Sequence, residues 1–388
     1  MLAISSLRVV FNSHRALLAG LLSAGLFVFS MSPSAAQPKK STAEPLRVVA
    51  SFSILGDMVS EIGGEHVALS TIVGPGGDAH TFEPAPKDVL ALANAQVLVL
   101  NGLDFEGWLP RLIKASGFKG QQILASDRVK VRLLNSDDQV VLGARDHAHD
   151  ADHGHDHDSD HAHDHANANA NANANANANA NANANASGHD HDHDDHDKAH
   201  DHAHDHAHSH AAGEVDPHAW QDLSNGIIYA TNIAEGLSRA DPANSASYRS
   251  RADIYIKRMQ KLDAEIKAVL KDIPKDRRTV ITTHDAFGYF AQAYGIRFIS
   301  VAGFSSAAEP SAKDLALIID NAKKHHVSGV FFENISSNKI MDQIARETGA
   351  KRGGTLYSDA LASPGEPAGT YLGMFSWNAG RLIRTLKP

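Results

Sequence analysis

Three histidines and one aspartate occupy positions from which they could bind a single metal ion. His80, His218 and His284 stand beside predicted strands or at the entry to a predicted helix, and Asp359 follows another predicted strand. Three imidazole nitrogens and one carboxylate oxygen suit Zn²⁺ and other late divalent metals, whereas Mg²⁺, Ca²⁺ and Mn²⁺ favour more oxygen ligands. Four such ligands complete a tetrahedral shell, which favours holding a metal over using it in catalysis. A single histidine in a loop more often makes ordinary hydrogen bonds than binds a metal, so the hypothesis of a metal site needs all four residues.

The elements that must position these residues alternate between strands and helices. Residues 46–52 and 67–73 are β-branched runs of strand length, and the apolar residues between them recur at helical spacing. Residues 96–101 predict a further buried strand, and a second alternating set begins with a strand at 278–283. This alternation predicts parallel sheets with helices outside, and ligands of such sheets bind beyond the carboxyl ends of the strands.

Between the two sets lies a segment rich in helix-forming residues. From about Pro242 to Ile273 apolar residues recur at near-helical spacing until Pro274. A helix of ~30 residues reaches ~45 Å, which is long enough to run along two domains. We therefore expect an α/β protein with two (β/α) lobes, 46–240 and 275–388, joined by a long helix over 241–274. The metal site would then lie in the cleft between the lobes.

The first 36 residues have the pattern of a secretory signal peptide. Arg8 and Arg15 precede an apolar run over 16–29, and small residues allow cleavage near Ala36. The apolar run has ~14 residues, against the ~20 that a membrane-spanning helix needs. A flexible tail would follow over 37–45. Because the chain has no cysteine, we expect no lipid anchor, and the mature protein should be exported to a periplasm.

A low-complexity segment interrupts the first predicted lobe at 146–213. His-Asp and His-Ala dipeptides flank ten Asn-Ala repeats at 167–186, and a segment without apolar residues to bury should be disordered. Exposed imidazoles with interleaved aspartates would bind Zn²⁺ weakly at several sites, because ordering entropy opposes each one. Such a segment captures zinc for the cleft or, alternatively, binds metal without biological consequence. Its eighteen histidines are His147, His149, His153, His155, His157, His161, His163, His165, His189, His191, His193, His196, His200, His202, His204, His206, His208 and His210.

Three further carboxylates are candidates for contacts around the metal ligands. Asp78 and Asp285 adjoin His80 and His284 in sequence, and Glu333 follows a predicted strand. Carboxylates near metal-bound histidines typically accept the second ring N–H and fix the orientation of the imidazole. The formal net charge of −9 argues against a general nucleic-acid-binding function.

Several motifs occur in the order found in one known family. They are Asp78-Ala-His80 with Glu83-Pro84, residues 94–108, Asp216-Pro-His-Ala-Trp220, Thr283-His-Asp-Ala-Phe-Gly-Tyr289, Glu309-Pro-Ser311 and Ser358-Asp-Ala-Leu361. With the leader and the histidine-rich insert, the chain resembles the periplasmic metal-binding proteins of ABC importers (cluster A-I), and within them the zinc-binding, ZnuA-like branch. The resemblance covers residues 46–388.

The resemblance implies a metal site made by His80, His218, His284 and Asp359, with water as the alternative fourth ligand. Manganese members typically carry glutamate in place of the third histidine, so His284 favours zinc. The implied function is a non-enzymatic carrier that binds Zn²⁺ as its transported ligand and delivers it to an inner-membrane ABC permease. We expect a monomer, which could also receive zinc from a periplasmic metallochaperone.

Two other function classes compete with the carrier. A metal-buffering or adhesin-like zinc-binding protein could use the same fold. A zinc hydrolase would need an open coordination position, a metal-bound water and a general base. The chain has no His-Glu-x-x-His motif, and Asp285 could act as a base only if Asp359 does not bind the metal.

Overall fold

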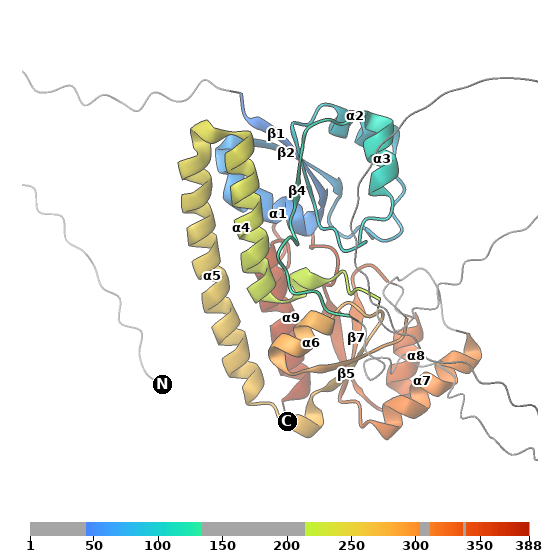
Figure 1. The fold of residues 1–388 in the computed structure, drawn as a ribbon. Helices are drawn as coiled ribbons and strands as arrows, with labels where there is room; N and C mark the ends of the chain where they lie inside the picture. Colours follow the sequence, from blue (N-terminus) through green and yellow to red (C-terminus); the bar gives the residue numbers. More distant parts are fainter. Residues whose placement is uncertain (1–43, 134–213, 303–310, 337–338, 388) are drawn as a thin grey trace, which may run out of the picture. The chain divides into compact units, whose positions relative to one another are not determined.

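The computed structural model describes residues 44–133, 214–302, 311–336 and 339–387, and these residues contain two four-stranded parallel sheets (Figure 1). The first sheet has the strand order β2-β1-β3-β4. Its strands are β1 (Leu46–Phe52), β2 (Val67–Val73), β3 (Val97–Leu100) and β4 (Gln121–Leu124). All its neighbouring strands pair in parallel, as the alternating pattern predicted. β1 is buried along nearly its whole length, as expected for a central strand of an α/β sheet.

Among the described residues of the first lobe, three helices connect these strands, and a fourth follows the last strand and leads to the long helix. They are α1 (Ser53–Gly63), α2 (Pro86–Ala93), α3 (Leu109–Ser116) and α4 (Leu223–Ala240). Pro86 stands at the first position of α2, where its missing N–H would have no helical partner in any case. The sequence pattern did not single out α3 and β4, which are short elements with half of their residues exposed.

The second lobe repeats the arrangement with the strand order β6-β5-β7-β8. Its strands are β5 (Thr279–Thr282), β6 (Arg297–Ser300), β7 (Gly329–Glu333) and β8 (Lys351–Leu356). Its helices are α6 (Gly288–Tyr294), α7 (Ala312–Lys324), α8 (Lys339–Thr348) and α9 (Tyr371–Leu386). β8 begins with Lys351 and Arg352, which pair with β7 although their side chains are exposed.

The predicted long helix is α5 (Ser245–Lys271), which has 27 residues. At 1.5 Å per residue it is about 40 Å long. It packs against α4 and α1 of the first lobe and against α9 and α6 of the second (Figure 1). The helix is shorter than predicted at both ends. Pro242–Asn244 forms a separate 3₁₀ turn before it, and Ile273 is excluded because the residue before Pro274 disfavours helical geometry.

The larger of two hydrophobic cores in the described residues includes residues of both lobes. Trp220 of the first lobe and Tyr371 of the second are fully buried in it, together with Phe52 and Phe290. Residues 45–388 accordingly form one compact unit. A smaller core lies under α7 and α8. Within the described ranges, none of the helices is long and apolar enough to cross a membrane. The predicted signal peptide, most of the tail and the histidine-rich insert lie outside the described residues.

Candidate metal centre

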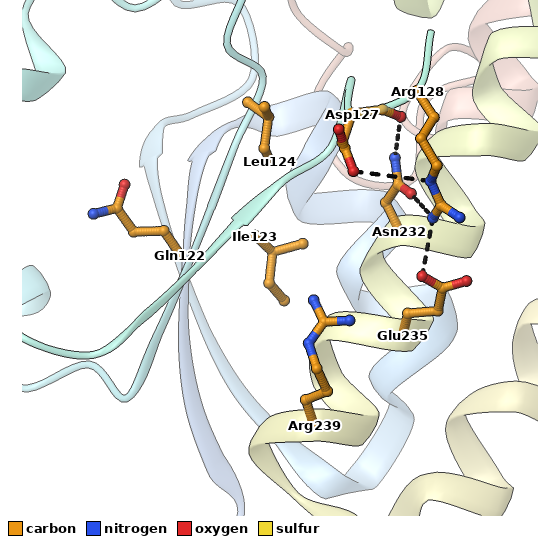
Figure 2. Close-up of a pocket in the computed structure, with 8 residues that line it drawn as sticks. All are labelled: Gln122, Ile123, Leu124, Asp127, Arg128, Asn232, Glu235 and Arg239. Atoms are coloured by element: carbon orange, nitrogen blue, oxygen red, sulfur yellow. Dashed lines mark hydrogen bonds and ion pairs between the residues drawn. The ribbon is translucent and has the colours of Figure 1, made fainter. Parts of the chain in front are cut away.

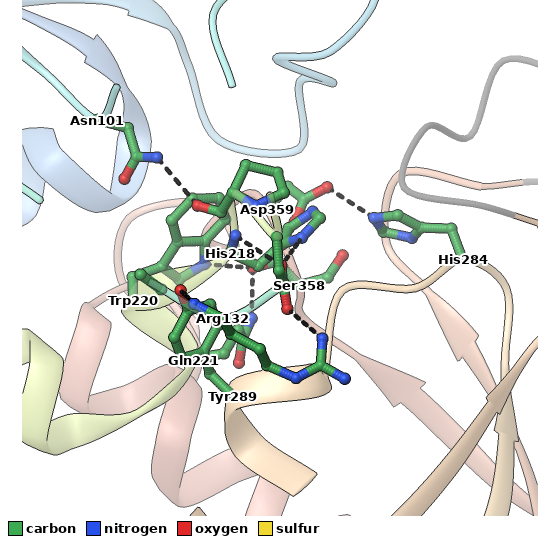
Figure 3. Close-up of polar contacts among 12 residues, drawn as sticks. Asn101, Arg132, His218, Trp220, Gln221, His284, Tyr289, Ser358 and Asp359 are labelled. Carbon is green, nitrogen blue, oxygen red and sulfur yellow. Dashed lines mark hydrogen bonds and ion pairs between the residues drawn. The ribbon is translucent and has the colours of Figure 1, made fainter. Parts of the chain in front are cut away.

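The four predicted ligands lie together where the carboxyl ends of strands from both lobes converge. His80 lies in the loop after β2, and His218 directly precedes the 3₁₀ turn that leads into α4. His284 follows β5, and Asp359 follows β8. One ligand atom from each of the four lies within 4.8 Å of every other. Figure 3 shows three of them, His218, His284 and Asp359, with His284 joined to Asp359.

Four separations between these side chains are close to the edge length of a tetrahedron around a small cation. His80 Nε2 lies 3.2 Å from His218 Nε2 and 3.4 Å from Asp359 Oδ2. Asp359 Oδ2 also lies 3.0 Å from His284 Nε2, and Asp359 Oδ1 lies 3.6 Å from His218 Nε2. Two donors that each lie about 2.0–2.1 Å from a tetrahedral zinc are themselves about 3.3–3.4 Å apart. A cation therefore fits among these atoms with little movement of the side chains.

The loop that carries His80 is fixed by hydrogen bonds and by aromatic packing. Asp78 accepts the backbone N–H of His80 at 2.8 Å and the Thr81 hydroxyl at 3.0 Å. The indole N–H of Trp108 donates to the Ala79 carbonyl at 2.8 Å. The His80 ring packs edge-on against Phe105, and burial lowers the pKa of this imidazole. His80 is therefore neutral at pH 7, which is the form that binds metals.

His218 is oriented by an aspartate two residues earlier in the chain. Asp216 Oδ1 lies 2.9 Å from the Nδ1 of His218 and also accepts its backbone N–H at 3.0 Å. Both side chains are fully buried. With Nδ1 turned to this carboxylate, Nε2 faces the other three side chains, as in a metal-bound histidine whose second ring nitrogen is held by a carboxylate. Asp216 was not among the carboxylates predicted to contact a ligand.

His284 lies between two carboxylates. Its Nδ1 is 2.7 Å from Glu333 Oε2, and its Nε2 is 3.0 Å from Asp359 Oδ2. Burial alone would lower the pKa of His284, but the charges of Glu333 and Asp359 outweigh it and raise this pKa well above its ordinary value. Glu333 Oε1 also accepts the backbone N–H groups of Thr283 and His284 at 2.8 and 3.0 Å. This buried glutamate thus holds both the ring and the backbone of the ligand.

Asp359 is a buried carboxylate with unused bonding capacity. Burial alone would raise its pKa, but the charges of His284 and His218 hold this pKa well below its ordinary value. Its Oδ1 atom is buried and has no hydrogen-bond partner among the described residues. A buried oxygen of this kind is costly to leave unsatisfied, and a bound cation would satisfy it.

The segment that carries Asp359 is joined to the first lobe mainly through carbonyl oxygens. The Ser358 carbonyl accepts from Trp220 Nε1 at 2.9 Å and from Gln221 Nε2 at 2.6 Å (Figure 3). Leu361 donates its N–H to the Ser53 hydroxyl and accepts the N–H of Gly76, both at 3.0 Å. These bonds hold the ligands from the two lobes at short range.

The three carboxylates that were predicted to contact the metal-binding histidines, Asp78, Asp285 and Glu333, differ in what they contact. Glu333 contacts a ligand ring, and Asp78 accepts the backbone N–H of a ligand. Asp285 is buried, and desolvation together with the nearby charge of Asp216 raises its pKa to about 6. All eighteen histidines of the insert lie outside the described residues. The Asp-x-His spacing, which occurs at both Asp78 and Asp216, was the sequence signal that could have identified Asp216.

A pocket away from the candidate metal centre lies between β4 and α4 (Figure 2). In it the Arg128 guanidinium pairs with Glu235 of α4 at 2.9 Å and also contacts Asn232. None of the predicted site residues lines this pocket. Its lining residues are Gln122, Ile123, Leu124, Asp127, Arg128, Asn232, Glu235 and Arg239.

Comparisons with known proteins identify the family of the chain. The family model described as ZnuA, zinc-uptake complex component A, periplasmic, matches residues 48–185 and 167–385. The iron ABC transporter substrate-binding lipoprotein MtsA of Streptococcus pyogenes is 26% identical over 373 residues, covering 94% of this chain and 97% of MtsA. The manganese ABC transporter substrate-binding lipoprotein PsaA of Streptococcus pneumoniae is 25% identical, covering 89% of this chain and 91% of PsaA.

Solved structures show the same fold. The periplasmic zinc-binding protein TroA of Treponema pallidum superposes with a TM-score of 0.64 at 22% identity, covering 89% of this chain and all of TroA. A manganese-bound periplasmic metal-binding protein of Candidatus Liberibacter asiaticus superposes with a TM-score of 0.62 at 21% identity, with the same coverage. The chain therefore belongs to the ZnuA family of substrate-binding proteins of metal ABC transporters.

Proposed function

We propose that this protein binds Zn²⁺ through His80, His218, His284 and Asp359 and delivers it to the membrane permease of an ABC importer. The observation that carries the proposal is the convergence of three Nε2 atoms and one carboxylate within 4.8 Å. A complete four-ligand shell leaves no position for a reactive water, so the site suits a carrier and not a hydrolase.

The donor set favours zinc over the metals named for the streptococcal relatives. Iron and manganese are the metals in the names of MtsA and PsaA. Three imidazoles and one carboxylate suit Zn²⁺, whereas Mn²⁺ favours sites with more oxygen. The ligand separations of 3.0–3.6 Å also agree with the short bonds of four-coordinate zinc.

The cellular setting follows from the leader and the family. We propose that the signal peptide is removed near Ala36 and that the mature chain acts as a monomer in the periplasm. Both curated relatives are lipoproteins by name, whereas this chain has no cysteine to carry a lipid. Residues 147–210 would bind additional zinc weakly and supply the tight site.

The test is zinc stoichiometry and affinity of the mature chain, measured by competition with a chelator that strips weak sites. We expect one tight site, which the His80→Ala variant loses. The His66→Ala variant is the matched control, since His66 lies outside the site and its ring contacts Tyr248. Equal tight binding by wild type and His80→Ala would refute the assignment of the site.

Transport needs a cellular assay. Deleting the gene should impair growth under zinc limitation, and added Zn²⁺ should restore growth where Mn²⁺ or Fe²⁺ does not. A strain that carries His80→Ala should behave like the deletion. If the purified protein binds zinc tightly but the deletion leaves zinc uptake unchanged, the protein is a metal buffer or an adhesin-like relative instead.

A further inference from the structure

Arg132 forms a buried ion pair with Asp216, the carboxylate that contacts His218 of the candidate metal centre. Its Nη1 donates to Asp216 Oδ2 at 2.9 Å, and the two side chains are 13% and 0% exposed. The other oxygen of Asp216 faces His218 Nδ1 at 2.9 Å. A continuous line of contacts therefore runs from the Arg132 guanidinium through the Asp216 carboxylate to a metal-binding imidazole.

Two residues of the second lobe, Gly288 and Tyr289, pack against this ion pair. The backbone N–H of Arg132 donates to the Tyr289 hydroxyl at 2.8 Å. A Cβ atom at Gly288 would lie 2.2 Å from Arg132 Nη1 and 2.6 Å from Asp216 Oδ2. The absence of a side chain at Gly288 is what allows the guanidinium and the carboxylate to pack against the start of α6.

The backbone fixes the same two residues beside each other. Leu133 and Val215 form an isolated antiparallel bridge, and the N–H of Asp216 donates to the Arg132 carbonyl at 3.0 Å. Arg132 and Asp216 are thus joined twice, once through the main chain and once through their side chains.

We propose that Arg132 is a positioning residue for metal binding: its guanidinium fixes the carboxylate of Asp216, which aims His218 Nε2 at the metal. The inference rests on the proposed metal site. A carboxylate that holds a metal-bound histidine must itself be held, and outer partners of this kind typically change metal affinity 10- to 100-fold when mutated. The planar fork of arginine fixes a carboxylate in a way that the point charge of lysine does not.

A simple charge effect predicts a different result. Arg132 is a cation close to a cation-binding site, so its charge alone opposes metal binding. If only charge mattered, Arg132→Gln would raise zinc affinity and Arg132→Lys would leave it unchanged. If positioning dominates, both substitutions lower the affinity. Gly288→Ala should lower it as well, because the new methyl group displaces the guanidinium while no charge changes.

The experiment uses the full mature chain and its three variants, Arg132→Gln, Arg132→Lys and Gly288→Ala. Tight-site zinc affinity is measured by chelator competition, and the visible absorption of the first equivalent of bound Co²⁺ reports the ligand geometry. Arg128→Gln is the matched control, since this arginine lies four residues earlier and pairs with Glu235. We expect a loss of affinity of about 10- to 100-fold and an altered Co²⁺ spectrum in the three variants, and neither change in the control.

Two outcomes would overturn the inference. Tighter zinc binding by Arg132→Gln together with unchanged binding by Arg132→Lys would show that only the charge acts. A lower melting temperature of the metal-free variants with unchanged affinity and Co²⁺ spectrum would reduce Arg132 to a structural residue. If the wild-type protein itself binds no zinc tightly, the proposed function fails, and that result is distinct from both.

Discussion

Zinc binding to this protein should release about one proton from His284 at pH 7.5. This imidazole lies between Glu333 and Asp359 at 2.7 and 3.0 Å, and their charges raise its pKa well above the ordinary value. The metal-free site therefore holds a buried imidazolium between two carboxylates. A metal can bind Nε2 only after the proton on that atom has left.

The size of the effect separates this site from one with ordinary histidines. Three imidazoles with pKa near 6.5 would together release about 0.3 protons at pH 7.5. His80 adds less still, since burial lowers its pKa. A protonated His284 brings the release close to one, and the apparent zinc affinity then rises about tenfold per pH unit until the pH exceeds the pKa of His284.

Isothermal titration calorimetry over the first equivalent of zinc, in buffers of different ionisation enthalpy, counts the released protons directly. Glu333→Gln removes one of the two charges that hold the proton, so the count should fall towards 0.3. Glu235→Gln is the control, because this carboxylate pairs with Arg128 on α4 and should leave the count unchanged. A wild-type count near 0.3, or one that Glu333→Gln does not alter, would refute the reasoning.

Three further predictions concern other parts of the molecule. Asp359→Asn should lower zinc affinity more than 100-fold, beyond the range typical of outer partners, whereas unchanged affinity by chelator competition would indicate water as the fourth ligand. Burial raises the pKa of Asp57, and the hydrogen bond from the backbone N–H of Tyr371 lowers it by less, so that the pKa is about 6 against an ordinary value of 3.8. The unfolded chain then loses this proton at lower pH than the folded protein, so this residue makes stability fall between about pH 4 and 6, and Asp57→Asn should remove that fall in thermal melts. Deleting residues 147–210 should abolish weak zinc binding and keep the tight site, and loss of both in equilibrium dialysis would contradict separate roles.

The sequence predicted that His80, His218, His284 and Asp359 come together, because their positions follow from topology. Parallel strands in one sheet end at the same edge, so polar residues directly after β2, β5 and β8 were expected to meet. The periodicity also located α5, although its ends depend on Pro242 and Pro274, whose effects reach beyond the proline itself.

The contacts around the ligands were harder to predict, because they depend on side chains distant in sequence. Arg132 and Asp216 are 84 residues apart, and no local pattern marks them as a pair. Asp78 and Asp216 stand in the same Asp-x-His spacing, and both accept the backbone N–H of the following histidine. Asp216 contacts the ring of its histidine as well, and the ring of His80 packs against Phe105.

The hydrogen bonds that join the segment of Asp359 to the first lobe have a consequence for how the metal site can change by mutation. The bonds that Ser358 and Leu361 make to the first lobe use main-chain groups, which stay the same whatever side chain stands at position 359. Replacing Asp359 therefore leaves in place the main-chain groups that make these bonds. The side chain that would meet the metal and the bonds that join the lobes are thus separable at this position, so position 359 is a site at which the choice of metal can be redesigned while the lobes stay joined.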